Sequence, residues 1–216
     1  MTRIARTLIA GTALAILTLS QACADGSSES NIINGQIDLQ SDISKVNVQV
    51  TDTNGNVTVD SIAGGNSADV FTMNNTNVKN NQFVGSGADI VSVLNADVKN
   101  TNGSVVLDSE ATCNQVAIST DPHNVNVDSN QDCDATDPYA QLNASVTNTT
   151  GDVTLYNRAA GNDFEEDTNA PNSNVRNYQT NNSTEYSNIN ATVANTTGNI
   201  SVTSVAVGNT AQVIHY

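Results

Sequence analysis

Apolar and polar residues alternate along short stretches of this chain, and the stretches recur at a fixed distance. Each pair of stretches flanks a glycine that closes a Thr/Asn-rich turn. The apolar positions before the glycine are Val46/Val48/Val50, Leu94/Ala96/Val98, Leu142/Ala144/Val146 and Ile189/Ala191/Val193. Those after it are Val57/Val59, Val105/Leu107, Val153/Leu155 and Ile200/Val202. Because the side chains of a strand point to its two faces in turn, the pattern predicts β-strands with one apolar face.

The turn glycines define an internal repeat. They are Gly55, Gly103, Gly151 and Gly198, which follow one another at steps of 48, 48 and 47 residues. A fixed period in this range is typical of solenoids and other repeat arrays. The fold prediction therefore rests on this repeat.

A second marker follows each turn glycine. An alanine stands eight residues after it, and a Gly-Asn pair comes shortly behind. The pairs are Gly65-Asn66, Gly161-Asn162 and Gly208-Asn209, with Cys113-Asn114 as the one departure. Since Gly and Asn both tolerate positive φ, the pair is interpreted as a second turn.

A third marker has the form Asn-Val-x-x-x-Gln and brings a glutamine to the same place in each full repeat. These glutamines are Gln82, Gln131 and Gln179. Amide side chains that lie above one another in stacked strands can form hydrogen-bonded ladders. Turn chemistry alone would explain the Asn-rich segments equally well, but it leaves the recurring glutamines without a reason.

The domain organisation follows from the repeat and from the N-terminal segment. Residues 1–24 have the form of a signal peptide, with Arg3 and Arg6 before an apolar run and an Ala-Cys-Ala site before Asp25. Residues 25–42 are a lead-in, and residues 43–216 are predicted to hold three full repeat units and one half unit. The apolar run is too short to span a bilayer, so we expect export without a transmembrane span in the mature chain. A lipoprotein anchored at Cys23 is the alternative, although the preceding Leu-Ser-Gln-Ala fits such a signal poorly.

The predicted fold is all-β, a repetitive β-solenoid or cross-β arch with units of about 48 residues. Aromatic residues make up 4% of the chain and Trp is absent, so a narrow aliphatic core must be repeated along an axis to become stable. Each unit is expected to supply about two stacked rungs of roughly 24 residues. The alternative is a β-sandwich of hairpins at the Asn-Gly and Thr-Gly turns.

Export leaves two cysteines in the mature chain, Cys113 and Cys133, and both lie in the second repeat. An oxidising compartment favours a disulfide between them. Two free thiols are the alternative interpretation.

The chain is strongly acidic, with a formal net charge of −15. Nucleic acid is therefore excluded as a partner, because it carries the same sign of charge. One acidic segment places oxygen ligands at alternate positions, as calcium loops do, namely Asp128, Asn130, Asp132 and Asp134. Calcium is the one cofactor candidate, but Cys133 and Tyr139 stand where a calcium loop has Gly and Glu, so a solvated acidic segment is the competing interpretation.

No enzyme signature occurs in the sequence, and the prediction is that the protein is not an enzyme. His123 and His215 are the two histidines of the chain, and neither lies in a motif for nucleophilic or zinc catalysis. A pair of carboxylates on a β-helix, as in some glycosidases, is the one enzymatic alternative.

The repeated stretches, such as residues 196–209 and 53–66, resemble the imperfect repeats of secreted bacterial functional amyloids and surface-anchoring proteins. The fapilins and the holdfast-anchoring proteins of stalked bacteria are the two families that are most similar in character. The resemblance implies an exported structural protein of the outer cell surface that forms or anchors extracellular fibres for attachment and biofilm matrix. It also implies self-association or association with other fibre proteins. A monomeric β-solenoid adhesin or carbohydrate-binding module, with extracellular polysaccharide as partner, is the alternative.

The incomplete last unit suggests how copies could associate. The final segment, residues 211–216, is expected to expose an unpaired strand edge, to which another chain can pair. Residues 31–39 of the next molecule are the predicted complementary edge, unless loops cover both ends.

Overall fold

The computed structural model describes residues 30–120 and 123–216, and these form twelve β-strands and no helix. The strands are β1 (Ser30–Asp38), β2 (Asp42–Asn54), β3 (Val57–Thr72), β4 (Thr76–Val84), β5 (Ile90–Asn102), β6 (Val105–Thr120), β7 (Val125–Cys133), β8 (Tyr139–Thr149), β9 (Val153–Thr168), β10 (Ser173–Asn181), β11 (Tyr186–Thr196) and β12 (Ile200–His215). The all-β prediction is confirmed. The predicted signal peptide lies outside the described residues.

The strands wind into a solenoid with three strands in each turn. Every third strand joins the same parallel sheet: β1-β4-β7-β10 in sheet A, β2-β5-β8-β11 in sheet B and β3-β6-β9-β12 in sheet C. Val57 lies beside Val105, which in turn lies beside Val153, so the repeat positions stack. The solenoid prediction is confirmed. The sandwich of hairpins is wrong, because it requires antiparallel neighbours.

Each repeat unit makes one turn of the solenoid, and the expectation of two 24-residue rungs is wrong. The reason is the Gly-Asn pair, which does not turn the chain. Gly65 and Asn66 lie inside the continuous strand β3, and the equivalent pairs lie inside β6, β9 and β12. The strand bends at this point and continues, and the Asn side chain faces the interior.

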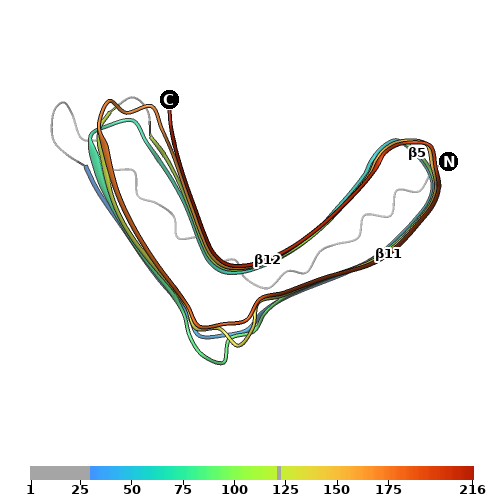
Figure 1. Cartoon of the computed structure of the whole chain (residues 1–216), viewed down its shortest axis with the longest axis horizontal. Helices are drawn as coiled ribbons and strands as arrows, with labels where there is room; N and C mark the ends of the chain where they lie inside the picture. The colour runs from blue at the N-terminus through green and yellow to red at the C-terminus, as the bar shows by residue number, and fades with distance from the viewer. Residues whose placement is uncertain (1–29, 121–122) are drawn as a thin grey trace, which may run out of the picture.

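The turns superpose on a V-shaped outline when the molecule is viewed down its shortest axis (Figure 1). Sheet C follows the inner side of the V through its bend, as β12 shows. The first half of each sheet C strand faces sheet B, and we call this layer pair arm BC. The second half faces sheet A, and we call that pair arm AC. The turns that contain Gly55, Gly103, Gly151 and Gly198 lie at the tip of arm BC.

The two arms have different interiors. Arm BC is filled mainly by Val, Leu and Ala, with Leu94, Leu107, Leu142 and Leu155 fully buried. A short row of buried Ser and Asn side chains also lies between sheets B and C, in which Ser92 bonds to Ser109 at 2.8 Å. Arm AC contains a smaller apolar cluster, of which Phe164 is the largest member, together with buried glutamine, asparagine, serine and threonine side chains. The solenoid therefore has one mainly apolar arm, which we call the apolar arm, and one mixed arm.

The end strands lie at the two open faces of the stack. β1, which precedes the predicted repeat domain, pairs with β4 residue by residue, so the described chain has four strands in each sheet. The edge pairing expected between residues 211–216 and residues 31–39 does not fit this topology, because β12 belongs to sheet C and β1 to sheet A. No helix in the described part of the chain is long and apolar enough to cross a membrane.

Candidate functional site

A ladder of asparagine side chains runs through the bend of the V. Asn66 donates to the Asn114 Oδ1 at 2.9 Å, Asn114 donates to Asn162 at 2.8 Å, and Asn162 donates to Asn209 at 2.8 Å. The same Nδ2 atoms also donate to backbone carbonyls of sheet A, those of Phe83, Asp132 and Thr180. The Asn of the predicted turn therefore ties sheet C to sheet A at the bend.

A ladder of glutamine side chains lies beside the asparagine ladder, inside arm AC. Gln82 donates to the Gln36 Oε1 at 2.8 Å, Gln131 to Gln82 at 3.0 Å and Gln179 to Gln131 at 2.9 Å. Each Nε2 also donates to a backbone carbonyl of sheet C, at Ser67, Gln115, Asp163 and Thr210. Gln82 and Gln131 are at most 1% exposed. Buried amides satisfied in this way hold one register of stacking.

Sequence reasoning missed the first member of this ladder, Gln36. The signal was present, because Asn31-Ile32 precedes Gln36 at the spacing of the Asn-Val-x-x-x-Gln marker, with Ile in place of Val. The neighbouring Asn34 continues the likeness, since it donates to the Asn80 Oδ1 at 2.7 Å. A tolerant version of the motif would have placed β1 in the solenoid.

Three of the four turn glycines, Gly103, Gly151 and Gly198, are required by stacking, whereas Gly55 has open space around it and a positive φ of 139°. A Cβ on Gly103 would lie 2.3 Å from the Gly55 carbonyl oxygen, and one on Gly198 would lie 2.3 Å from the Gly151 oxygen. The left-handed position of the turn is instead taken three residues earlier, with φ of 53–57°. Its occupants are Asp52, Asn100, Asn148 and Asn195, residue types that tolerate αL.

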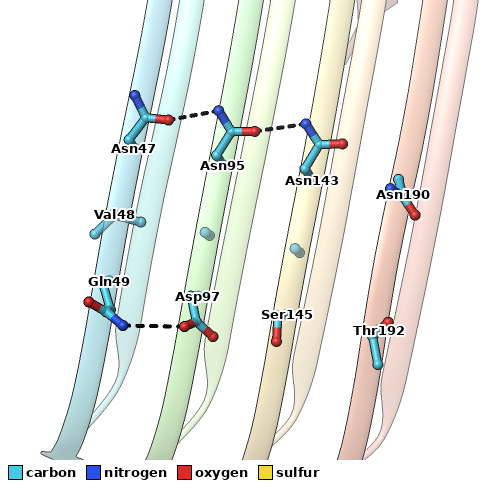
Figure 2. Close-up of a pocket in the computed structure, with 11 residues that line it drawn as sticks. Asn47, Val48, Gln49, Asn95, Asp97, Asn143, Ser145, Asn190 and Thr192 are labelled. Atoms are coloured by element: carbon cyan, nitrogen blue, oxygen red, sulfur yellow. Dashed lines mark hydrogen bonds between the residues drawn. The ribbon is translucent and has the colours of Figure 1, made fainter.

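The outer face of sheet B carries a further amide ladder (Figure 2). Asn95 donates to the Asn47 Oδ1 at 2.7 Å, and Asn143 donates to Asn95 at 2.7 Å. Asn190 stands at the same position of the last turn. These side chains border a shallow groove of about 510 Å³, whose other side carries Gln49 and Asp97. Aliphatic side chains such as Val48 and Ala96 line the groove together with these polar ones, and it is open to solvent.

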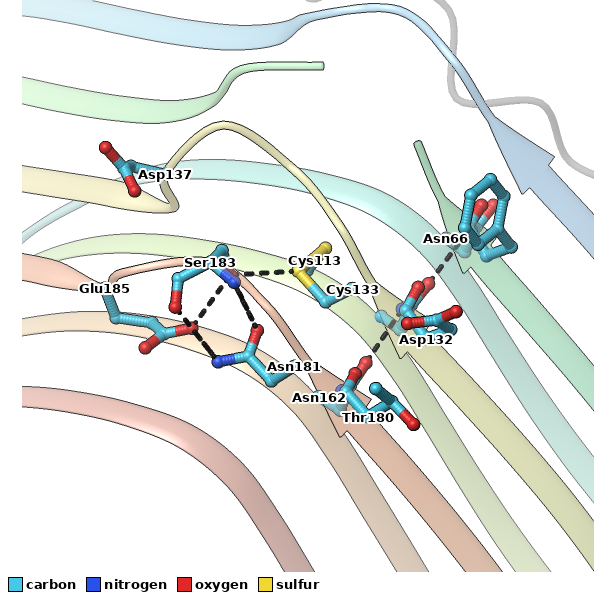
Figure 3. The surroundings of a disulfide bond; sticks show 12 residues. Asn66, Cys113, Asp132, Cys133, Asp137, Asn162, Thr180, Asn181, Ser183 and Glu185 are labelled. Carbon is cyan, nitrogen blue, oxygen red and sulfur yellow. Dashed lines mark hydrogen bonds between the residues drawn. A yellow bond between two sulfur atoms is a disulfide. The ribbon is translucent and has the colours of Figure 1, made fainter. Parts of the chain in front are cut away.

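The predicted disulfide between Cys113 and Cys133 is confirmed (Figure 3). It joins sheet C to sheet A at the bend. One turn earlier, the equivalent positions hold Gly65 of the first turn and Val84 of the second, and a Cβ on Gly65 would come within 2.8 Å of the Val84 Cγ2. A small residue on sheet C thus makes room for a larger one on sheet A, and the disulfide fills the equivalent space between the second and third turns. A cross-link over such a loop stabilises by about 3 kcal/mol.

The concave side of the V carries a charged cluster centred on Arg158, whose side chain is 12% exposed. Arg158 pairs with Glu110 of the turn below it and, at 2.8 Å, with Asp163 beyond the bend of its own strand. Burial raises the pKa of nearby Asp108 to about 6, and the charges of Glu110 and Asp60 add to the shift. The guanidinium therefore holds the two halves of sheet C at their angle.

The acidic residues predicted to bind calcium lie on a strand rather than in a loop. Asp128, Asn130 and Asp132 occupy alternate outward positions of β7, and Asp134 follows its end. Alternate side chains of a strand are spaced by about 7 Å, so their oxygens do not converge as in a loop. Within the described residues, no three His, Cys, Asp or Glu side chains gather as a metal site. Calcium binding stays a prediction.

The two histidines lie far apart in the sequence. His123 lies in the connection before β7, and His215 ends β12. The described residues thus offer stacked amides, a disulfide and open strand edges as their conspicuous chemistry, which suits a structural role.

A known protein family matches this chain. The family of holdfast attachment protein D matches residues 36–215, nearly the whole described solenoid. No curated protein and no solved structure shows a significant match. The resemblance to holdfast-anchoring proteins is therefore supported, whereas the resemblance to fapilins stays an expectation. This family is structural and adhesive, acts in surface attachment and implies a location at the cell surface or outside the cell. The chain belongs to the holdfast attachment protein D family.

Proposed function

We propose that this protein is an exported structural subunit that forms or anchors extracellular fibres at the bacterial surface. The observation that carries the proposal is the placement of exposed apolar side chains. All large hydrophobic residues that are markedly exposed lie in the first or the last turn of the solenoid, and the two middle turns, as far as described, contribute none.

Several of these side chains point outward from their strands, so their exposure does not result only from the missing neighbour at the end of the stack. Ile33, Ile37 and Phe71 point outward from the first turn and are 78%, 72% and 65% exposed. The residues beside Ile33 and Phe71 in the second turn are Lys79 and Ser119. The exposed apolar side chains thus concentrate at the ends of the solenoid, on the outer faces of both sheet A and sheet C. Exposed apolar surface that is concentrated in this way is typical of an interaction site.

Both ends also present strands without a neighbour on one side. β1, β2 and β3 form one face of the stack and β10, β11 and β12 the other. Natural proteins usually protect such edges with charge, proline or a covering segment, because free edges pair with other chains. Assembly through the ends gives the edges partners and covers the apolar side chains.

The predicted signal peptide supports export, with cleavage before Asp25 or lipidation at Cys23 as the two routes. A single molecule that acts as an adhesin or carbohydrate-binding module remains the alternative. The two proposals differ in what the purified protein does at rising concentration.

The test is a time course of the exported protein by light scattering and electron microscopy, at low and moderate salt. Fibres are expected, with faster growth at moderate salt because each copy carries a formal net charge of −15 in the full chain. Fibre diffraction should contain the strand spacing of about 4.7 Å along the fibre axis. A chain that stays monomeric at every concentration and salt would contradict fibre formation, and a glycan screen would then test the alternative.

A further inference from the structure

We infer that copies of this chain join head to tail, so that β10, β11 and β12 of one copy pair in parallel register with β1, β2 and β3 of the next. The inference rests on the proposed function and names its contact. Its first support is the direction of the two interior amide ladders, which end at opposite faces of the stack with opposite hydrogen-bonding needs.

The direction of the asparagine ladder is fixed by backbone carbonyls, which can only accept. Each Nδ2 of Asn66, Asn114 and Asn162 donates to a carbonyl oxygen and to the amide oxygen of the next turn. Among the described contacts, the Asn66 Oδ1 receives no donor and the Asn209 Nδ2 has no acceptor. The first turn thus offers an asparagine acceptor, and the last turn offers an asparagine donor.

The glutamine ladder runs in the opposite direction. The Nε2 atoms of Gln82, Gln131 and Gln179 each donate to the amide oxygen of the preceding turn and to a backbone carbonyl. The Gln36 Nε2 makes only the carbonyl contact, to Ser67, in the described set. The first turn therefore offers a glutamine donor, and the Gln179 Oε1 of the last turn is the matching acceptor.

Head-to-tail contact satisfies both ladders at once. Asn209 would donate to Asn66 of the next copy, while Gln36 of that copy would donate to Gln179. A contact between two first turns would place two Asn66 acceptors together and two Gln36 donors together, and it would also oppose the parallel strand direction. The two ladders therefore favour a polar contact, in which the last turn of one copy meets the first turn of the next.

The outward positions supply an independent argument, because they do not follow the repeat. In one column of sheet C the residues are Ile62, Glu110, Arg158 and Val205. In another they are Phe71, Ser119, Asp167 and Ile214. Repetition alone would make the ends resemble the middle turns, yet here the ends resemble each other. Head-to-tail stacking places Val205 beside Ile62 and Ile214 beside Phe71, apolar against apolar.

The first test is Asn209→Asp. The carboxylate still accepts from Asn162, so the fold of the single molecule is retained, but it cannot donate to Asn66 of the next copy. The loss of this hydrogen bond between Asn209 and Asn66 at a buried junction should raise the concentration needed for assembly about tenfold or more. The matched control is Asn190→Asp, which adds the same charge to the same turn. On the outer ladder each later Asn donates to the earlier one. At the junction Asn190 would therefore accept from Asn47 of the next copy, which a carboxylate can also do, and this variant should assemble as the parent does.

The second test traps the contact directly. Ile62→Cys and Val205→Cys are made in separate chains and oxidised alone and mixed. Adjacent parallel strands bring such positions within disulfide range, so the mixture should form a cross-linked dimer and neither chain alone should do so. Circular dichroism checks that both variants fold.

The outcomes separate this inference from the proposed function. Fibres that form without the mixed cross-link, or that tolerate Asn209→Asp, overturn the head-to-tail contact and leave the fibre proposal standing. A mixed cross-link in a protein that never forms fibres supports the contact and contradicts fibre formation. Cross-linking of Ile62→Cys with itself overturns the polarity.

Discussion

The two arms of the V solve the same stacking problem with different chemistry. Arm BC is held by aliphatic side chains such as Leu94 and Leu142, which gain stability from burial alone and place few demands on direction. Arm AC buries Gln82 and Gln131, which are satisfied only if each turn lies directly above the last. The comparison teaches that the apolar arm supplies stability, whereas the mixed arm specifies register.

The largest expected effect tests the apolar arm. Leu142→Ala removes a fully buried side chain and should lower the free energy of unfolding by about 2–5 kcal/mol. Leu142→Ile, which keeps the volume, should cost less than about 1.5 kcal/mol. Urea denaturation followed by circular dichroism measures both. A loss for Leu142→Ala as small as that for Leu142→Ile would remove the distinction between the arms.

A smaller effect tests the mixed arm. Gln131→Leu keeps an apolar side chain of similar length but leaves Gln82 and Gln179 without their amide partner. The expected loss in the free energy of unfolding is about 1–3 kcal/mol. The control is Gln115→Leu, the same substitution at an exposed outward position, which should stay within about 0.5 kcal/mol. If both variants are equally stable, arm AC is held by packing rather than by its ladder.

The smallest expected effect concerns the carboxyl group of Glu166, which belongs neither to the aliphatic core of arm BC nor to the amide ladder of arm AC. Glu166 is fully buried, with no hydrogen bond to either carboxyl oxygen in the described structure, and its column neighbours are Ile118 and Val213. Burial raises the pKa of Glu166, the charge of His215 opposes the shift and Asp167 adds to it. Glu166→Ile should therefore stabilise the protein at pH 7.5 by about 1 kcal/mol or more.

The pH dependence follows from the sign of that shift. A carboxyl with a raised pKa in the folded state contributes stability below its unfolded pKa and loses it as the pH rises through the folded pKa. The melting temperature of the parent should thus fall from pH 5 to pH 7.5. Asp108, with a pKa of about 6, and Asp42, whose burial beside Asp38 raises its pKa to about 7, act in the same direction. Glu166→Ile and Glu166→Gln should each flatten the profile, and an unchanged profile would contradict the role of Glu166.

The repeat made much of the fold predictable. The steps between Gly55, Gly103, Gly151 and Gly198 anticipated the pairing of residues about 48 apart, and the compartment inferred from the signal peptide anticipated the disulfide. The number of strands per turn was not predictable, because Gly-Asn at a bend and Gly-Asn at a turn look the same in sequence. Only the packing of sheet A against sheet C reveals that the Asn66 amide faces inward.

Two features of the candidate site could not be predicted from the sequence, for a related reason. Gly103, Gly151 and Gly198 are required by the backbone of the adjacent turn, which would lie 2.3 Å from a Cβ on Gly103. The φ preference of a residue gives no information on such a contact. The acidic segment from Asp128 had the spacing of a calcium loop, but alternate spacing also describes one face of a strand. Residue spacing alone does not distinguish these geometries.

The disulfide has a mechanical consequence for a protein of surface attachment. Each turn adds only about 4.8 Å of height, whereas its roughly 48 residues can extend to about 160 Å when pulled free. Tension on the chain ends would therefore unwind the solenoid from its outer turns. Each turn that is released would lengthen the molecule by its extended chain. Cys113–Cys133, with a sequence separation of 20, withholds that stretch from extension and binds the second turn to the start of the third. The cross-link thus limits how far a loaded molecule can lengthen before its middle turns must yield.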